Sequence, residues 1–393
     1  MISVEDALVR ILALSAPLAS EVVPLRQAAG RVLAADARAR LTQPPFAASA
    51  MDGYAILEGD HHPSRALMVI GEAGAGHAFA GTVGPGQAVR IFTGAPVPAG
   101  ADRVVLQEDV TRDGDRITLG DRLEKSIHIR PLGQDFKVGD RLSAPRRLRP
   151  ADLALLAAMN LPEVPVARRP VVALLATGDE LVMPGEDPRA DQIVASNSFA
   201  LAAMAERAGA EARMLPIARD TEASLRHAFA LAEGADVIVT IGGASVGDHD
   251  HVGRVAQSLG LTQNFWKIAM RPGKPLMAGR LGNAVMLGLP GNPVSAIVTA
   301  HLFLLPLLAH LQGLPARHDT RQARLATAVE ANGPRTHYMR ARLSSGDGMA
   351  SITPMGSQDS ALLTILSQAD ALLIRPLGDG ARPAGSVVDY LPL

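Results

Sequence analysis

One long segment of the chain, residues 170–313, alternates short apolar runs with amphipathic stretches, and no other feature constrains the fold as strongly. Strands and helices that alternate at this spacing predict a doubly wound, mainly parallel sheet. In sheets of this class, ligands bind in the loops that follow the carboxyl ends of the strands. The predicted elements are strands at 171–176, 211–217, 236–241 and 265–270, helices at 198–208, 222–231 and 252–258, a hairpin around 281–283, and a long helix after Asn292.

The sequence on either side of this segment has a different texture. Residues 4–14 have helical apolar spacing, and residues 24–37 resemble a short connector and a helix. Between residues 44 and 135, short apolar runs alternate with glycine and proline turns, which predicts an all-β insertion. After Pro315 the pattern of short apolar runs typical of β-strands returns, so we expect a small barrel or sandwich at the end of the chain.

The charge balance excludes several classes of partner. Lysine and arginine number 38 against 39 aspartate and glutamate, so this 393-residue chain has no global field that attracts nucleic acid or an anionic membrane. A basic run at 146–149 precedes a predicted helix at 151–160, and it indicates a solvated connector rather than a binding patch. The absence of cysteine excludes thiolate metal sites and leaves oxygen and nitrogen ligands. Because the overall charge is balanced, any anion site must come from a local group of residues.

The sequence also predicts a cytoplasmic protein. Its first ten residues carry Glu5 and Asp6 and lack the basic and apolar regions of a signal peptide. The longest apolar stretch, 294–311, contains His301 and Pro306, which favours a buried helix over a membrane span.

A glycine-rich loop, GGASVGDHD, occupies 242–250 after the strand at 236–241. Paired glycines let backbone amides approach an anion without obstruction from side chains. The loop therefore predicts an anion or nucleotide site, although a tight turn that needs glycine explains it as well. Its spacing fits neither a Walker A loop nor the dinucleotide fingerprint. Zinc binding by His249 and His251 is disfavoured, because neighbouring side chains point in alternating directions.

Two further loops at strand ends carry polar groups. In 288–295, Asn292 stands in an N-cap position and Pro293 at the first helical position, so capping alone explains this motif equally well. In TGDE, residues 177–180, two carboxylates follow the first strand, where they could hold Mg²⁺ against a phosphate. A helix cap is the alternative explanation.

Three cations, Lys267, Arg271 and Lys274, stand within the stretch 267–275. Together with rigid prolines they could hold a phosphate or an oxyanion such as molybdate, and solvated surface cations are the alternative. In one doubly wound domain, all four loops would meet on the same edge of the sheet. Their convergence favours a phosphate-containing ligand with a divalent ion.

In their order along the chain, these motifs resemble those of the molybdopterin molybdenumtransferases, the MoeA and gephyrin E-domain family. The stretches similar to the signatures around the β insertion of that family are PPFAASAMDGYA (44–55), RIFTGAPVP (90–98) and RPLGQDFKVG (130–139). The loops similar to the cofactor-binding domain that it shares with the molybdopterin adenylyltransferases are 242–250, 267–275 and 288–295. Only the first group separates the two kinds of enzyme, because MogA-type adenylyltransferases consist of little more than the α/β domain.

The resemblance implies an elongated homodimer with four domains in each protomer. These are a MogA-like α/β domain, a small connector, an inserted β domain and a C-terminal β-barrel. The implied boundaries are 1–20 with 167–315 for the α/β domain, 21–43 with 137–166 for the connector, 44–136 for the insertion and 316–393 for the barrel. The implied site lies where the α/β domain of one subunit meets β elements of the other.

The resemblance also transfers functional roles to matching positions. The implied catalytic residues are Asp52, Thr93, Asp135, Glu180, Asp220, Asp250, Lys267 and Arg271. The implied cofactor-binding residues are Gly242, Gly243, Ser245, Gly247, Lys274, Pro290, Gly291, Asn292, Pro293, Arg340 and Ser360. The implied Mg²⁺ ligands are Glu180, Asp220 and Asp250.

The implied reaction converts adenylated molybdopterin and molybdate into molybdenum cofactor and AMP, with Mg²⁺ neutralising charge during cleavage. Adenylyl transfer onto molybdopterin and a non-catalytic cofactor-binding scaffold are the alternatives. The implied partners are the molybdopterin adenylyltransferase and molybdoenzyme maturation proteins.

Two positions depart from the family pattern. Arg271 stands where many members have lysine, so a planar guanidinium replaces the compact ammonium group of lysine. Asp359 precedes Ser360 where glycine is usual, and its carboxylate would repel molybdate unless it turns outward.

Overall fold

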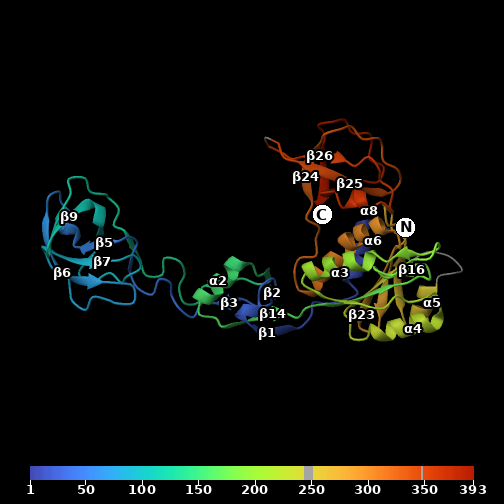
Figure 1. Cartoon of the computed structure of the whole chain (residues 1–393), viewed down its shortest axis with the longest axis horizontal. Helices are drawn as coiled ribbons and strands as arrows, with labels where there is room; N and C mark the ends of the chain where they lie inside the picture. The colour runs from blue at the N-terminus through green and yellow to red at the C-terminus, as the bar shows by residue number, and fades with distance from the viewer. Residues whose placement is uncertain (243–250, 347) are drawn as a thin grey trace.

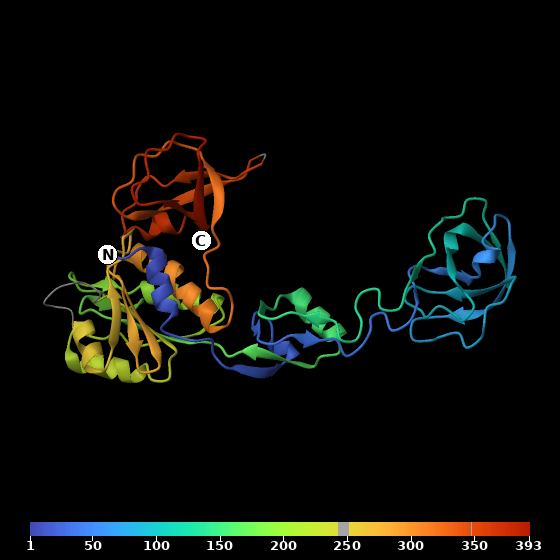
Figure 2. The same ribbon diagram turned by 180° about the vertical axis from the view of Figure 1, so that it is seen from behind.

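The computed structural model describes residues 1–242, 251–346 and 348–393. Figures 1 and 2 show an elongated molecule with a β-rich unit at one end and a small connector in the middle. An α/β sheet and a barrel lie together at the other end, and the chain passes through the connector twice.

A six-stranded sheet forms the centre of the α/β unit. Its order is β18-β15-β19-β23-β22-β20, and β22 runs antiparallel to both neighbours while the other pairs are parallel, as predicted. The strands are β15 (Val171–Ala176), β18 (Glu211–Met214), β19 (Val237–Ile241), β20 (Thr262–Trp266), β22 (Met277–Leu281) and β23 (Ala284–Leu289). The helices are α1 (Val4–Leu12), α3 (Asn197–Arg207), α4 (Glu222–Leu231), α5 (His251–Ser258), α6 (Pro293–Thr299) and α7 (Leu305–Leu311).

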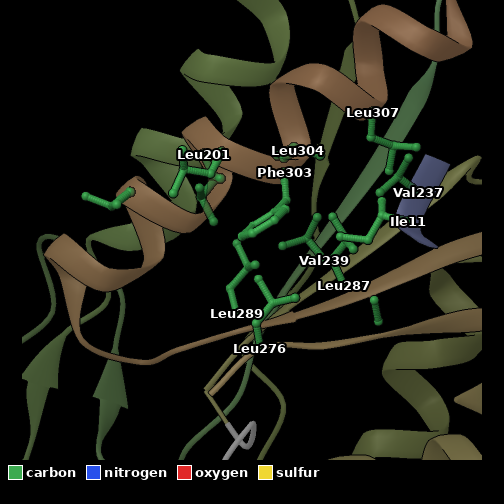
Figure 3. Packing of buried hydrophobic residues seen from close by; sticks show 14 of the residues in the cluster. Ile11, Leu201, Val237, Val239, Leu276, Leu287, Leu289, Phe303, Leu304 and Leu307 are labelled. Carbon is green, nitrogen blue, oxygen red and sulfur yellow. The ribbon is translucent and has the colours of Figure 1, made fainter. Parts of the chain in front are cut away.

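Helices cover both faces of this sheet, which makes it doubly wound. Neighbouring residues of β15 belong to different cores, because successive strand side chains point to opposite faces. Val172 packs with α1, α3 and the helix after Asn292, whereas Ala173 packs with α4 and α5. Figure 3 shows the first core, in which Ile11 of α1 and Phe303 of the long helix pack over β19 and β23.

The helix after Asn292 continues to Leu311 through a π-helical segment, Ala300–Leu304, between α6 and α7. By length and composition it could cross a membrane, but 72% of its apolar window is buried inside the protein. The predicted core helix is therefore confirmed.

The strand expected at 265–270 is wrong. β20 ends at Trp266, and Lys267 takes a left-handed conformation with φ 77°. Met270–Arg271 then form β21, which pairs in parallel with a strand of the barrel. The apolar run continues past the end of β20 because this stretch is buried between two domains.

The connector joins the outgoing and returning segments of the chain through paired strands. β1 (Ser20–Pro24) pairs with β14 (Glu163–Ala167), and β3 (Ala37–Arg38) pairs with β12 (Arg141–Leu142). The helix predicted at 151–160, in the returning segment, is confirmed as α2 (Pro150–Ala158).

The helix expected within 24–37 is wrong. Leu25–Gln27 form only one 3-10 turn, η1, and Val32–Leu33 form strand β2, which pairs with β13 (Arg146–Arg147). Val32 and Leu33 are both buried, so tertiary packing decides their conformation.

The arginine run is engaged in the connector, contrary to the expectation of a solvated segment. Arg146 donates to Asp152 Oδ1 at 2.7 and 3.0 Å, and this bond is the main reason why the pKa of Asp152 falls to about 2. Arg147 donates to the carbonyl oxygens of Gly30 and Ala208, both at 2.9 Å. Because Ala208 is the C-cap residue of helix α3, Arg147 ties the connector to the α/β unit.

The insertion is built on β-strands, as predicted. Its main sheet has the order β8-β5-β7-β6-β10-β9. The strands of this sheet are β5 (Gly53–Ile56), β6 (Ala66–Ala73), β7 (Gln87–Ile91), β8 (Arg103–Leu106), β9 (Val110–Asp113) and β10 (Arg116–Leu119). A separate pair is formed by β4 (Ala48–Ser49) and β11 (Ile129–Arg130).

The C-terminal unit is a closed barrel rather than a sandwich. Its order is β25-β26-β24-β28-β27, and β27 pairs back with β25. The strands are β24 (Arg321–Leu325), β25 (Thr336–Ser344), β26 (Ser351–Pro354), β27 (Ala371–Arg375) and β28 (Val387–Pro392), with helix α8 (Leu363–Leu366) beside them. Because each unit has its own sheet, we propose to divide the chain at the boundaries that the resemblance implied.

Candidate active site

A cavity of about 620 Å³ opens at the carboxyl edge of the α/β sheet. It brings together the ends of β15, β19 and β23, the start of α3, and the short parallel strands β16 (Leu181–Val182) and β17 (Ile193–Val194). Ala361 reaches it from the C-terminal unit. The lining residues from the predicted set are Glu180, Gly242, Pro290, Gly291, Asn292 and Pro293.

The loops at this edge pack backbone against backbone. Gly242 has φ 93°, and a side-chain carbon added there would lie 2.9 Å from the carbonyl oxygen of Thr177. Glycine is therefore required at 242 both by the turn and by the close approach. The other predicted members of the loop, Gly243, Ser245, Gly247 and Asp250, lie outside the described residues.

The loop that carries Glu180 is organised by an arginine. Arg219 Nη1 donates to the carbonyl oxygens of Gly178, Asp179 and Leu181 at 3.4, 3.2 and 3.1 Å. The amide of Asp220 donates to Asp179 Oδ1 at 3.2 Å, so the two acidic loops lie side by side. Glu180 faces the cavity, whereas Asp220 is not among its lining residues.

The segment 290–293 is clamped between α3 and the barrel. Asn197 Nδ2 donates to the carbonyl oxygen of Gly291 at 2.8 Å. Asn292 makes no side-chain capping bond, and its Nδ2 donates instead to Ser360 Oγ at 3.2 Å. The amide of Val294 donates to the carbonyl oxygen of Ser360 at 3.1 Å. Asn292 thus connects two domains at the rim of the cavity.

Arg340 lies behind the loop that bears Ser360. It is 1% exposed, and its guanidinium donates to the carbonyl oxygens of Ser357 and Leu362 at 3.2 and 3.3 Å. Burial lowers the pKa of Arg340, and the nearby Asp359 opposes that shift. Asp359 Oδ1 accepts a hydrogen bond from the amide of Ala361 at 2.9 Å, so its carboxylate is used within its own loop.

The cationic stretch runs from the α/β sheet to the barrel. Arg271 and Lys274 are exposed, and Lys267 is half-buried. Pro275, at the end of this stretch, lines the cavity. Burial lowers the pKa of His337, the partner of Arg271 in the β21–β25 pairing, to about 4, and the positive charge of Arg271 contributes.

The predicted residues of the insertion form a separate group. Asp52 Oδ1 accepts hydrogen bonds from the amide and the hydroxyl of Thr93, both at 2.7 Å, and these bonds lower the pKa of Asp52. Asp135 lines another cavity, of about 560 Å³, together with Phe46 and Arg130. The insertion that carries Asp52 and Thr93 lies at the opposite end of the molecule from the α/β unit, and Asp135 lies where the chain returns to the connector, next to Phe136 of the connector core (Figure 1).

Sequence reasoning missed several residues of the cavity. Ser196 and Asn197 line it at the start of α3, Thr177 lines it at the end of β15, and Arg219 supports it from outside. For Ser196 and Asn197 the signal in the sequence was a Ser-Asn-Ser run at the start of a predicted helix, which capping explains as well; Thr177 stood in the TGDE motif, where only the carboxylates were assigned a role.

Comparison with known proteins agrees with this architecture. Three family models match: the MoeA N-terminal region (domain I and II) at residues 2–160, the probable molybdopterin binding domain at 173–310, and the MoeA C-terminal region (domain IV) at 322–393. A molybdopterin molybdenumtransferase from a Nostoc species is 36% identical over 387 residues, which covers 95% of this chain and 89% of that protein. The enzyme of that name from Haemophilus influenzae is 40% identical, over 76% of this chain and 74% of its own length.

A solved structure of a molybdopterin biosynthesis MoeA protein from Pyrococcus horikoshii OT3 superposes with a TM-score of 0.85. It is 27% identical in sequence, and the match covers 100% of both chains. Sequence similarity and fold therefore agree over every domain described above. The chain belongs to the molybdopterin molybdenumtransferase (MoeA) family.

Proposed function

We propose that this protein inserts molybdate into adenylated molybdopterin and releases AMP and molybdenum cofactor. The observation that carries the proposal is the α/β cavity, where the ends of three parallel strands meet a loop of the C-terminal barrel. An anionic ligand suits this edge, because the start of α3 lines the cavity and Pro275, which directly follows the exposed Lys274, lines it as well. The relatives that carry the molybdenumtransferase name match the chain over most of its length.

The residues of the cavity fit Mg²⁺ in the way that phosphate-transferring enzymes usually hold it. Mg²⁺ commonly binds one or two carboxylates together with substrate phosphates and water. Glu180 faces the cavity, and Asp220 and Asp250 are the other proposed ligands. Within the described ranges no group of three or more acidic or histidine side chains is arranged as a complete metal site. In the proposed site these carboxylates would hold the ion jointly with the substrate, whose phosphate charge it would neutralise.

A direct assay tests the proposed function against its alternatives. Purified protein with adenylated molybdopterin and Mg²⁺ should release AMP only when molybdate is added. Consumption of ATP with free molybdopterin would instead indicate an adenylyltransferase. Stoichiometric binding without turnover would indicate a scaffold.

We also propose that the active site is shared between two copies of the chain. The insertion with Asp52 and Thr93 lies at the opposite end of the protomer from the α/β unit with Glu180, and the cavity that Asp135 lines shares no residue with the α/β cavity, so these groups are not joined within one chain of this structure. Exposed apolar side chains stand near both groups, Phe46 and Met51 in the insertion and Ile193 and Val194 beside the α/β cavity, and such side chains favour association. A homodimer in which each insertion reaches the α/β unit of its partner satisfies both observations.

Mixing two inactive variants checks the shared site. Asp135→Ala damages the insertion half of the site and Glu180→Gln damages the α/β half, so neither homodimer has an intact site. In an equal mixture that exchanges subunits, half of the dimers regain one intact site, and we expect about a quarter of wild-type AMP release. Failure to recover activity although sedimentation and mass spectrometry show heterodimers would contradict the shared site. So would full activity of a stable wild-type monomer.

Molybdate is proposed to bind where the barrel loop meets the α/β cavity, near Ser360, Arg340 and Lys274. Since Arg340 is buried and donates to two loop carbonyls, its first effect is to hold Ser360 in place, and direct donation to molybdate stays a prediction. Arg340→Ala should raise the molybdate concentration for half-maximal insertion by roughly tenfold to a hundredfold. The variant would lose the hydrogen bonds that hold the Ser360 loop and any hydrogen bond from the guanidinium to molybdate.

The measurement is a molybdate titration at saturating adenylated molybdopterin. Arg342→Ala on the same strand is the matched control, since Arg342 is exposed and its side chain bonds Gln368. Ser360→Ala should shift the titration in the same direction as Arg340→Ala. A defect in pterin binding with an unchanged molybdate requirement would place both residues elsewhere in the site.

The proposed substrate defines the setting of the enzyme. Adenylated molybdopterin is the product of adenylyl transfer onto molybdopterin, so we infer the molybdopterin adenylyltransferase as a partner in the cytoplasm. Molybdoenzyme maturation proteins would receive the finished cofactor.

A further inference from the structure

The hydroxyl of Thr177 is buried and has no polar partner among the residues that the structure describes. Thr177 follows the last residue of β15 and is 4% exposed. Its Oγ1 makes no hydrogen bond to any described residue. Buried polar groups in proteins are nearly always hydrogen-bonded, so an orphaned hydroxyl indicates that something else supplies the partner.

The position of Thr177 shows where that partner would come from. Thr177 lines the α/β cavity, and its hydroxyl lies beside Gly242. A side-chain carbon added at Gly242 would be 3.3 Å from Thr177 Oγ1, so glycine leaves this side of the hydroxyl uncrowded. Because Oγ1 itself is covered, a ligand in the cavity would reach it from the side of Gly242 by a small shift of the neighbouring atoms.

The chemistry of the cavity selects an anionic oxygen as this partner. Ser196 and Asn197 at the start of α3 line the same cavity, and the first turn of α3 carries no acidic residue. The positive end of the helix is thus not neutralised locally and favours an anion. A threonine hydroxyl can donate one hydrogen bond to such an oxygen.

We propose that Thr177 donates its hydroxyl hydrogen to a phosphate oxygen of bound adenylated molybdopterin. This inference rests on the proposed function and adds a substrate-contacting residue to the site. The hydroxyl has no partner among the described residues, and the proposal therefore assigns it a role in binding rather than in stability.

Thr177→Val tests the proposal, because it removes the hydroxyl and keeps the β-branched shape. The dissociation constant for adenylated molybdopterin, measured by calorimetry without molybdate, should rise roughly tenfold to a hundredfold. The melting temperature should stay the same or rise, since a buried orphaned hydroxyl is removed. Thr177→Ser keeps the hydroxyl and should restore most of the affinity.

Thr240→Val is a matched control from the adjacent strand β19. Thr240 is 0% exposed, and its hydroxyl also has no partner among the described residues, but it does not line the cavity. This variant should keep or raise the melting temperature and leave substrate affinity unchanged.

Several results would overturn the proposal. An unchanged dissociation constant in Thr177→Val would mean that the hydroxyl does not contact the substrate. A lower melting temperature together with weak binding that serine does not rescue would mean that Thr177 acts through packing. A change confined to the molybdate requirement would assign the hydroxyl to molybdate. If the wild type itself did not bind adenylated molybdopterin, the proposed function would fail first.

Discussion

Glu180→Gln is expected to slow molybdate-dependent AMP release by about a hundredfold or more, because it removes negative charge where Mg²⁺ and phosphate are proposed to meet. Glutamine has nearly the same shape, so the loop held by Arg219 should keep its conformation. The turnover number should be measured at saturating substrate over a range of Mg²⁺ concentrations. The concentration of Mg²⁺ needed for half-maximal rate should also rise.

Glu186→Gln is the control for this experiment. Glu186 is exposed, lies a few residues further along the chain, and accepts a hydrogen bond from the amide of Met183 at 2.8 Å, which glutamine can also accept. It is not among the cavity-lining residues, so its rate should equal that of the wild type. A Glu180→Gln rate close to wild type at every Mg²⁺ concentration would remove Glu180 from the metal site.

Asp379→Ala is expected to destabilise the barrel by roughly 3–5 kcal/mol, because it leaves the buried guanidinium of Arg375 without its counter-charge. The side chains of Arg375 and Asp379 are 2% and 8% exposed, and their atoms Nε and Oδ2 are 2.6 Å apart. Asp379 also accepts hydrogen bonds from Arg382 at 2.8 and 3.0 Å. Calorimetry of wild type and variant should show the difference in the unfolding of the barrel.

The effect of Asp379 should depend on pH in a defined direction. Its hydrogen bond with Arg382, and then that with Arg375, lowers its pKa in the folded protein. A carboxylate with a lowered pKa stabilises the fold above its unfolded pKa, near 3.8, and this contribution is lost as pH falls through the folded value. The difference in the free energy of unfolding between wild type and Asp379→Ala should therefore have its full size at pH 7 and shrink below about pH 4. Asp389→Ala is the control, because Asp389 is an exposed residue of the barrel, and it should change the free energy of unfolding little at either pH.

The sequence was sufficient for those parts of the fold that depend on local pattern. Alternation of apolar runs and helical periods predicted the doubly wound sheet, since each element signals its own buried face. The stretches at 24–37 and 265–270 failed for the opposite reason. Val32 and Leu33 become strand because the returning chain pairs with them, and Met270 leaves the sheet because the barrel pairs with it. Neither partner is close in sequence.

The candidate site divides in the same way. The motifs placed Glu180, Gly242 and Asn292 in loops that do meet at one cavity. They could not show that Arg340 is buried behind the Ser360 loop, because this depends on how residues some twenty positions apart fold over it. Thr177 was missed because an orphaned hydroxyl is a property of packing, and no residue pattern encodes it.

The packing of α1 has a consequence for the order in which the protein folds during synthesis. This helix leaves the ribosome first, yet Ile11 is buried against the π-helical segment and α7, which are made about three hundred residues later. The insertion, whose main sheet needs only residues 53–119, can fold in the meantime. The apolar face of α1 must wait for its partners, and at typical translation rates of roughly 5–20 residues per second the wait lasts tens of seconds. We therefore expect nascent chains halted before Leu311 to hold α1 exposed, available to chaperones and to proteases, while the insertion is already resistant to both.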